Sequence, residues 1–422
     1  MKIGLSEVYA LKGGFQGWKK ADYPLEPKKA EQQNCIACHE QITPQVVGDW
    51  QSSRHGKSAN DVSCSICHGT DHSNATDIEE AQIPTDKRCR FCHERDWQSF
   101  QKGKHALAWK SKDNIPDYHY SIQKEKPGTD EKSCDQCHKI GLKSASRTKL
   151  LWRDQGIYGS NSCANCHTPH TFSRKKANRP QACRPCHSGT QTPQWESYTA
   201  SRHFQVRQKS SNSSTKRQGP TCQSCHLPDD SHGVQTAWGS IGLRLTLPPE
   251  DEEWSKACTD ILTALRAYSP QNGSGDLLDT YQHLRFFPVE RDDWEKKRRT
   301  MIRTCSKCHE QSFAESRLQD ADRMIRSSDL LLARGIAILE ELYTKRYLEA
   351  PDRYSFPSLI NSSREMAEAE RIVRDMFYIH RKQVKSGSFH APESKLAQKG
   401  LRALEESLDR LRDIREDLEA RE

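Results

Sequence analysis

The sequence predicts a mainly α fold in two unlike parts. The interior of the N-terminal part cannot be filled by side chains alone, and the C-terminal part is a domain of long helices. Only 34% of the 422 residues are hydrophobic, and the mean hydropathy is −0.93. These values are low for a chain long enough to form two or three domains. Cysteines gather in the first 230 residues, whereas apolar residues recur at helical spacing from about residue 312.

Eight CxxCH motifs account for 16 of the 17 cysteines, and only Cys258 lies outside them. The cysteine pairs are Cys35 and Cys38, Cys64 and Cys67, Cys89 and Cys92, Cys134 and Cys137, Cys163 and Cys166, Cys183 and Cys186, Cys222 and Cys225, and Cys305 and Cys308; the histidines that follow them are His39, His68, His93, His138, His167, His187, His226 and His309. Two thiols at this spacing can each add to one vinyl group of haem, and the next histidine then lies under the iron as an axial ligand. The motifs therefore predict eight covalently bound haem c groups, each with its iron, in a multihaem cytochrome c fold with a haem-packed N-terminal part.

Paired cysteines also occur in zinc ribbons and in disulfide frameworks. Zinc does not require a histidine after every pair, and here all eight pairs have one. The sequence therefore favours haem over zinc or disulfides.

The formal charge of +8 does not indicate a nucleic-acid partner. Each haem brings two propionates, so eight haems add roughly sixteen negative charges, partly offset by ferric iron. The chain also has no basic run with interleaved aromatic residues. We therefore expect no binding to nucleic acid.

We divide the chain into three parts. Residues 1–235 form a haem-rich domain with seven motifs, residues 236–300 a connector, and residues 301–422 a helical domain with the eighth haem and a C-terminal amphipathic helix. The dense motifs leave room mainly for loops and short helices in the first part, with few strands.

Three longer helices are expected in the last part: one from about residue 312, one over about 363–385, and one after Pro392. The third helix carries leucines spaced by three and four, interrupted by Arg415. These leucines are Leu401, Leu404, Leu408, Leu411 and Leu418. The stripe can pack on the body of the chain or on another subunit, and the sequence leaves both open.

Ten histidines lie outside the motifs, and there are only five methionines, so bis-histidine ligation of iron is the natural expectation. His119 and His283 lie among polar neighbours and are not expected to bind iron. The predicted distal ligands are His55, His72, His105, His170, His203, His232 and His390.

With eight motifs in this order, the chain resembles the octahaem hydroxylamine oxidoreductase family from about residue 33 to 391. The likeness includes VSCSICHGTDH, QKGKHALAW, YGSNSCANCHTPHTFS, RPQACRPCH with PQWE after it, PTCQSCHLPDDSHGVQTAWG, and HRKQVKSGSFH with the MFYI before it.

The resemblance implies a mainly helical, haem-packed fold, commonly a homotrimer. It also implies one five-coordinate active haem, usually on the fourth motif, with seven bis-histidine haems that carry electrons. His138 is then the proximal ligand of the active haem, and His170 is a second candidate catalytic residue. No motif is CxxCK, unlike those of related nitrite reductases whose active haem has a lysine ligand.

Three features depart from the family pattern. Oxidative members carry a tyrosine shortly after the GSFHAP stretch that cross-links to a haem of a neighbouring subunit, whereas the last tyrosine here is Tyr378. An Asp-His pair commonly precedes PQWE and would suit proton delivery, and here Gln191 and Thr192 stand there. Pro169 stands where arginine is expected.

Two functions follow from these features. One is a reductase of a small nitrogen oxide, nitrite or hydroxylamine, at an open haem. The other is a silent electron-transfer conduit or scaffold in a larger redox complex. A third function, oxidation of hydroxylamine or hydrazine, is disfavoured because the cross-linking tyrosine is missing.

The remaining expectations concern location and partners. Haem is attached outside the cytoplasm, so we expect an exported protein of the periplasm or an equivalent compartment. The segment MKIGLSEVYALKGGFQGW has no apolar signal region, which suggests a processed or re-engineered start, and no stretch is long and apolar enough to span a membrane. Other redox proteins, such as a small cytochrome or a quinone-linked donor, are the expected partners, with a homotrimer or larger assembly.

Overall fold

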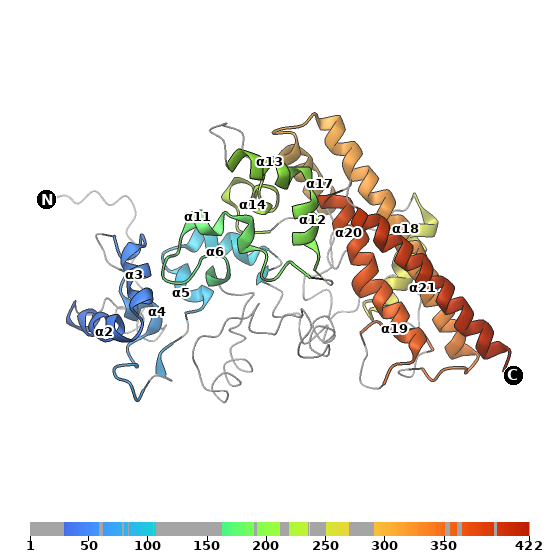
Figure 1. The fold of residues 1–422 in the computed structure, drawn as a ribbon, viewed down its shortest axis with the longest axis horizontal. Coiled ribbons are helices and arrows are strands. Elements are labelled where there is room, and N and C mark those ends of the chain that lie inside the picture. The colour runs from blue at the N-terminus through green and yellow to red at the C-terminus, as the bar shows by residue number, and fades with distance from the viewer. Residues whose placement is uncertain are drawn as a thin grey trace. The chain divides into compact units, whose positions relative to one another are not determined.

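The computed structural model describes residues 29–58, 62–77, 80–82, 84–103, 105–106, 163–189, 192–211, 219–234, 236, 250–269, 291–350, 355–360, 365–391 and 395–421. These residues are mainly helical and contain no strand element, so the predicted fold class is confirmed (Figure 1). None of the described helices is long and apolar enough to cross a membrane.

The described residues belong to two compact units. The first unit takes its residues from 1–100 and 138–177, and the second from 101–137 and 178–422. This division into two units follows contacts between residues, whereas our three-part division follows the order of motifs along the chain. The three-part division stays a prediction.

The first unit contains short helices, as the dense motifs predict. They are α2 (Lys29–Ile42), α3 (Pro44–Ser52), α4 (Cys64–His68), α5 (Asp86–Arg90), most of α6 (Glu94–Gln101), the 3-10 turn η3 (Cys163–Asn165) and α11 (Arg174–Ala177). Val47 and Ala177 are the buried hydrophobic residues that the structure describes in this unit. Among the described residues of this unit, side chains therefore supply almost no core.

The second unit begins with short elements and continues with long helices. The short elements are η4 (Pro180–Ala182), α12 (Gln194–Ala200), α13 (Arg202–Ser211), α14 (Cys222–His226) and η5 (Pro228–Asp230). The longer part comprises α15 (Glu252–Ala264), α17 (Arg291–Cys305), α18 (Gln311–Thr344), α19 (Glu368–Asp375), the π-helical segment η7 (Met376–His380), α20 (Arg381–His390) and α21 (Lys395–Glu419).

The long helices form a bundle with a conventional hydrophobic core. Figure 1 shows α21 running along α18 and α20, and these helices pack against one another. Ile261 and Leu262 of α15 are fully buried in the same core. Part of the segment predicted as a connector is thus an integral helix of the bundle.

The leucine stripe of α21 packs within the chain. Leu404, Leu408 and Leu411 are buried in the core of the bundle, with Leu401 and Leu418 partly buried at its edge. Arg415, which interrupts the stripe, lies 3.3 Å from the carboxylate of Glu341 on α18. Of the two alternatives, the structure shows packing on the body of the chain.

A close helix crossing lies between α20 and α21. A Cβ atom built on Gly400 would lie 2.7 Å from the carbonyl oxygen of His380, and one on Gly387 would lie 2.6 Å from the backbone nitrogen of Ala397. Only glycine permits this approach of two backbones. The crossing therefore depends on these two residues.

Candidate haem sites

Each described CxxCH motif is folded into a single helical turn. In the motifs that lie in turns or at a helix end, the histidine N–H donates to the carbonyl oxygen of the first cysteine at 2.9–3.0 Å. These histidines are His93, His167, His187 and His309. The second and seventh motifs form the short helices α4 and α14. A helical turn places residues four apart on one side, so both thiols and the imidazole can meet one flat ligand.

None of the described motif cysteines is in a disulfide bond, so each keeps the thiol that a thioether bond to haem requires. Within the described ranges, no group of three or more histidine, cysteine, aspartate or glutamate residues is placed to hold a metal ion. The side chains that gather are instead pairs of histidines.

The second cysteine of a motif is less covered by the polypeptide than a haem-packed interior would suggest. In five described motifs this cysteine is exposed, and in the motifs of α4 and α14 the corresponding residues, Cys67 and Cys225, are half-buried. The exposed ones are Cys38, Cys92, Cys166, Cys186 and Cys308. Their attachment to haem stays a prediction, and the predicted interior is not built by the polypeptide alone.

The cysteines of the fourth motif are a separate case. Cys134 and Cys137 lie outside the described residues, together with His138 of the same motif. His119 and His283, which were not expected to bind iron, also lie outside them. The haem predicted on Cys134 and Cys137 therefore stays a prediction from the sequence.

Six motif histidines each face one histidine from elsewhere in the chain, with ring centres 5.9–6.2 Å apart. The pairs are His39 with His72, His93 with His55, His68 with His170, His187 with His105, His309 with His203, and His226 with His390. Three pairs lie in each unit.

This separation fits an iron atom between two imidazoles. A bond from a transition metal to an imidazole nitrogen is about 2 Å long. The centre of each ring lies roughly 1 Å beyond its nitrogen, so two imidazoles on opposite sides of one metal have centres roughly 6 Å apart. Directly stacked rings would lie closer together. The residues present therefore fit bis-histidine haem.

Six of the seven predicted distal histidines occur in these pairs, and the seventh, His232, is half-buried just after η5. His167 of the fifth motif is also half-buried. The roles of these two residues as iron ligands stay predictions.

Burial keeps several distal histidines in the form that binds metal. It lowers the pKa of His55, His105 and His170, with a neighbouring motif histidine adding to the effect in each case. Burial also lowers the pKa of His390 to about 4. Neutral imidazole is the metal-binding form, so these sites favour ligation at neutral pH.

In several of these histidine pairs, the Nδ1 atom of one imidazole contacts a polar atom of the protein. His39 Nδ1 lies 2.9 Å from the hydroxyl of Thr43, His68 Nδ1 lies 3.0 Å from the carbonyl oxygen of Gln82, and His390 Nδ1 lies 3.0 Å from that of Ser386. Such contacts fix the tautomer and the orientation of the ring. None of these partners is predictable from the motif spacing.

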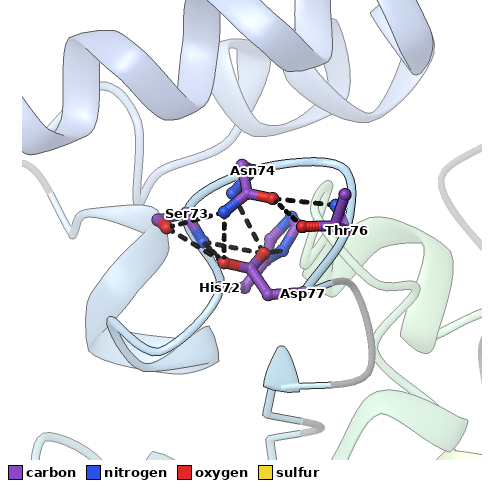
Figure 2. Close-up of polar contacts among 5 residues, drawn as sticks. All are labelled: His72, Ser73, Asn74, Thr76 and Asp77. Atoms are coloured by element: carbon purple, nitrogen blue, oxygen red, sulfur yellow. Dashed lines mark hydrogen bonds and ion pairs between the residues drawn. The ribbon is translucent and has the colours of Figure 1, made fainter.

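His72 has a different partner, the carboxylate of Asp77 at 2.7 Å (Figure 2). Hydrogen bonds from the backbone of Asn74 and from Ser73 hold the pKa of this carboxyl well below its ordinary value. Asp77 was also missed from sequence. The signal that was available is the run of short polar residues DHSNATD, which favours side chains bonding to nearby backbone.

In the first unit, thiols of different motifs lie next to one another. A hydrogen bond with Cys163 lowers the pKa of the Cys89 thiol. Cys64 lies close enough to Cys35, and Cys67 close enough to Cys89, for the charges of their thiolates to interact. The first, second, third and fifth motifs therefore form a connected series.

The second unit repeats this arrangement. A hydrogen bond with Cys183 lowers the pKa of the Cys222 thiol, and Gln223 Nε2 lies 3.8 Å from the Cys183 sulfur. Cys225 lies close enough to Cys305 and Cys308 for their charges to interact. The sixth, seventh and eighth motifs thus form a second series.

Two ion pairs hold the eighth motif at the junction of α17 and α18. Arg298 donates two hydrogen bonds, of 3.1 and 2.6 Å, to the carboxylate of Asp322. Lys307, inside the motif, lies 3.3 Å from Asp229 near the seventh motif. The paired geometry of Arg298 fixes its position more firmly than the exposed Lys307 pair.

The residues between the sixth motif and PQWE form hydrogen bonds back to that motif. Thr192 Oγ1 donates to the carbonyl oxygens of Cys186 and Ser188, at 3.1 and 2.9 Å. Glu196 accepts a hydrogen bond from the N–H of Gly189 at 3.1 Å. Gln191 lies outside the described residues. The Thr192 hydroxyl thus stabilises the haem-binding turn.

These motifs and histidine pairs define a multihaem c-type cytochrome, and comparison with known proteins agrees. Residues 31–236 and 288–355 match the family described as seven times multi-haem cytochrome CxxCH. The chain belongs to this family, whose motifs bind haem c covalently.

The resemblance to hydroxylamine oxidoreductases is confirmed as well. A probable nitrite reductase-hydroxylamine oxidoreductase fusion protein of Kuenenia stuttgartiensis is 25% identical to this chain, in a match that covers 81% of this chain and 42% of that protein. The chain thus spans less than half the length of this relative.

Two solved structures share the fold. A reducing HAO-like protein complex of Kuenenia stuttgartiensis matches with a TM-score of 0.67 and 20% identity, over 94% of this chain and 88% of that one. A hypothetical multiheme protein matches with a TM-score of 0.65 and 16% identity, over 95% and 98%. At these identities, the likeness concerns the fold.

Proposed function

We propose that the protein is an octahaem c-type cytochrome that carries electrons through bis-histidine haems to one open haem, where it reduces a small nitrogen oxide, nitrite or hydroxylamine. The six histidine pairs with ring centres 5.9–6.2 Å apart carry this proposal. An iron with two imidazole ligands has no free position for substrate, so it suits electron transfer.

The residues of this chain have separate tasks in that function. The cysteines anchor the haems, and the paired histidines close both axial positions and help to set the potentials. The adjoining thiols bring neighbouring haems together within each unit. In this assignment His170 faces His68 and acts as an iron ligand, not as a catalytic residue.

The open haem is assigned to the fourth motif, with Cys134 and Cys137 as its anchors and His138 as its proximal ligand. This assignment rests on the family resemblance, because the motif lies outside the described residues. The haem would supply the redox centre that exchanges electrons with the nitrogen oxide.

The reductive direction rests on two observations. No tyrosine follows Tyr378, so the chain lacks the residue that forms the cross-link in oxidative members. The structural neighbour is called reducing. Both observations favour reduction.

The position of Thr192 favours a second candidate, an electron conduit or scaffold without catalysis. A proton donor beside an open haem needs a group that can reach the substrate. The Thr192 hydroxyl is instead engaged with the carbonyl oxygens of Cys186 and Ser188. Loss of the Asp-His pair would then mark loss of catalysis.

Electron paramagnetic resonance of the oxidised protein, with carbon monoxide binding to the reduced protein, distinguishes the two functions. A high-spin signal with carbon monoxide bound at about one haem in eight is expected for the reductase. Nitrite and hydroxylamine reduction are then assayed with a chemical donor. If every haem is low-spin and none binds carbon monoxide, the reductase is excluded and the conduit remains.

The proposal extends to location and assembly. Covalent haem attachment supports an exported protein of the periplasm or an equivalent compartment. The structural neighbour is a protein complex, which supports redox partners such as a small cytochrome or a quinone-linked donor, and a homotrimer or larger assembly.

A further inference from the structure

The loop that carries His72 is organised around one carboxylate, that of Asp77 (Figure 2). Asp77 Oδ2 accepts hydrogen bonds from the backbone N–H and the hydroxyl of Ser73, at 3.0 and 2.9 Å, and from the side-chain amide of Asn74 at 2.8 Å. Asp77 Oδ1 accepts from the backbone N–H of Asn74 at 3.0 Å and lies 2.7 Å from His72 Nδ1.

These contacts define the state of the imidazole. An oxygen surrounded by donors is an acceptor, so the hydrogen atom between Asp77 and His72 is on Nδ1 of the histidine. Nε2 of His72 is then the lone-pair nitrogen, available to iron. The ring of His39, the other member of the pair, has its centre 6.1 Å away.

The partner of His72 differs in charge from those of three other axial histidines. His68 and His390 contact neutral backbone carbonyls, and His39 contacts a hydroxyl. The carboxylate of Asp96 lies 3.8 Å from His93 Nδ1, which is too far for a hydrogen bond.

A hydrogen bond to a carboxylate changes the ligand itself. It is shorter and stronger than a bond to a neutral acceptor, and it raises the basicity of the imidazole more. A more basic ligand stabilises ferric iron over ferrous iron, because the ferric ion carries more positive charge. The haem bound by such a histidine should therefore be harder to reduce.

We propose that Asp77 is a positioning residue that lowers the reduction potential of the first-motif haem through its hydrogen bond to His72. The inference rests on the proposed ligation of that haem by His39 and His72. In the adjoining second motif, His68 Nδ1 contacts the neutral carbonyl of Gln82, so the acceptor for His68 is neutral where that for His72 is charged.

The test is a redox titration of the Asp77→Asn holoprotein, followed by optical and paramagnetic resonance spectra. The substitution keeps the shape of the side chain and removes its charge. We expect one low-spin haem to become easier to reduce, with about a tenfold higher ratio of reduced to oxidised haem at fixed potential, ~59 mV for one electron. The resonance of the same haem should shift as its ligand becomes less anionic.

Asp71→Asn is the matched control. Asp71 is exposed, precedes His72, and its side chain accepts a hydrogen bond of 3.4 Å from Gln82. This variant removes the same charge from the same loop without breaking the bond to His72. An equal shift in both variants would show a general effect of charge and overturn the role of Asp77.

His72→Ala separates the ligation from the tuning. If His72 binds iron, this variant converts one haem to a high-spin form that binds carbon monoxide, and it identifies the spectrum of the first haem. If every haem stays low-spin, the proposed ligation itself is wrong. The tuning role fails if His72→Ala opens the first-motif haem but Asp77→Asn leaves the potential of that haem unchanged. It also fails if Asp77→Asn does no more than convert that haem to a high-spin form. In either case Asp77 serves only to hold the loop.

Discussion

Arg381 of α20 and Asp329 of α18 form an ion pair that is almost completely buried, with Arg381 Nε 2.6 Å from Asp329 Oδ1. The second carboxylate oxygen accepts a hydrogen bond of 2.9 Å from the indole of Trp254 on α15. One carboxylate therefore joins three helices of the bundle, and no solvent can replace any of its partners.

We expect Asp329→Ala to lower the free energy of unfolding by about 3–5 kcal/mol, because it leaves the Arg381 charge buried without its counter-ion. Denaturant unfolding followed by helical circular dichroism measures this loss. Glu368→Ala is the control, since its pair with Arg410 is half-exposed, and should cost at most about 1 kcal/mol. Similar losses in the two variants would contradict the prediction.

Gly400→Ala tests the crossing of α20 and α21. The added methyl group would lie 2.7 Å from the His380 carbonyl oxygen, so the helices must separate at a cost of about 1–3 kcal/mol. Gly48→Ala on α3 has nothing within 4 Å of the new Cβ and should be neutral or slightly stabilising. The measurement is the midpoint temperature of thermal unfolding for both variants. An unchanged midpoint for Gly400→Ala would refute the close approach of the two helices.

His203→Ala should open the eighth-motif haem, because His203 faces His309 with ring centres 5.9 Å apart. One further high-spin haem that binds carbon monoxide is expected. His283→Ala, which removes a histidine not predicted to bind iron, should leave the number of low-spin haems unchanged. A new high-spin signal in the control instead would reverse the assignment of these histidines.

Asp251 should make the free energy of unfolding of the bundle depend on pH in the acidic range. A hydrogen bond from Arg326 lowers the pKa of this carboxyl, which also accepts a hydrogen bond from the N–H of Trp254 at the start of α15. Because the pKa is lower in the folded state, the stabilisation is fully present above the unfolded value of about 3.9 and is lost as the pH falls through the folded value. The difference in unfolding free energy between wild type and Asp251→Asn should thus be constant from about pH 7 to 5 and shrink below about pH 4.

His138→Ala should abolish reduction of nitrite and hydroxylamine while most of the haem spectrum stays intact. Each of the other haems has the histidine of its own motif, so only one haem loses its proximal ligand. Steady-state assays with a chemical electron donor measure the effect. Turnover equal to wild type would move the active site away from the fourth motif.

The sequence predicts the haem attachment and the helical class because both depend on local spacing. It also selects His55, His72, His105, His170, His203 and His390, since few other residues can serve as second ligands. It does not predict which histidine faces which. His226 and His390, for example, meet only after α14 and α20 are placed together.

Other features depend on the conformation of the folded chain. Asp77 reaches His72 because the intervening loop turns back on itself, a geometry that spacing alone does not reveal. The π-helical segment Met376–His380 lies inside what the periodicity predicts as one regular helix. Its aromatic residues Phe377 and Tyr378 are buried in the core of the bundle, a tertiary environment that the periodicity does not reveal.

The scarcity of buried hydrophobic side chains in the first unit has a consequence for how the protein matures. Among the residues described there, Val47 and Ala177 are the buried hydrophobic ones, whereas the bundle formed by α15 and α18 to α21 has a continuous core. We therefore expect the bundle to fold on the polypeptide alone, and the first unit to gain its interior as cofactor is attached. In cells that cannot attach haem, proteases should remove the N-terminal half and leave a resistant C-terminal fragment.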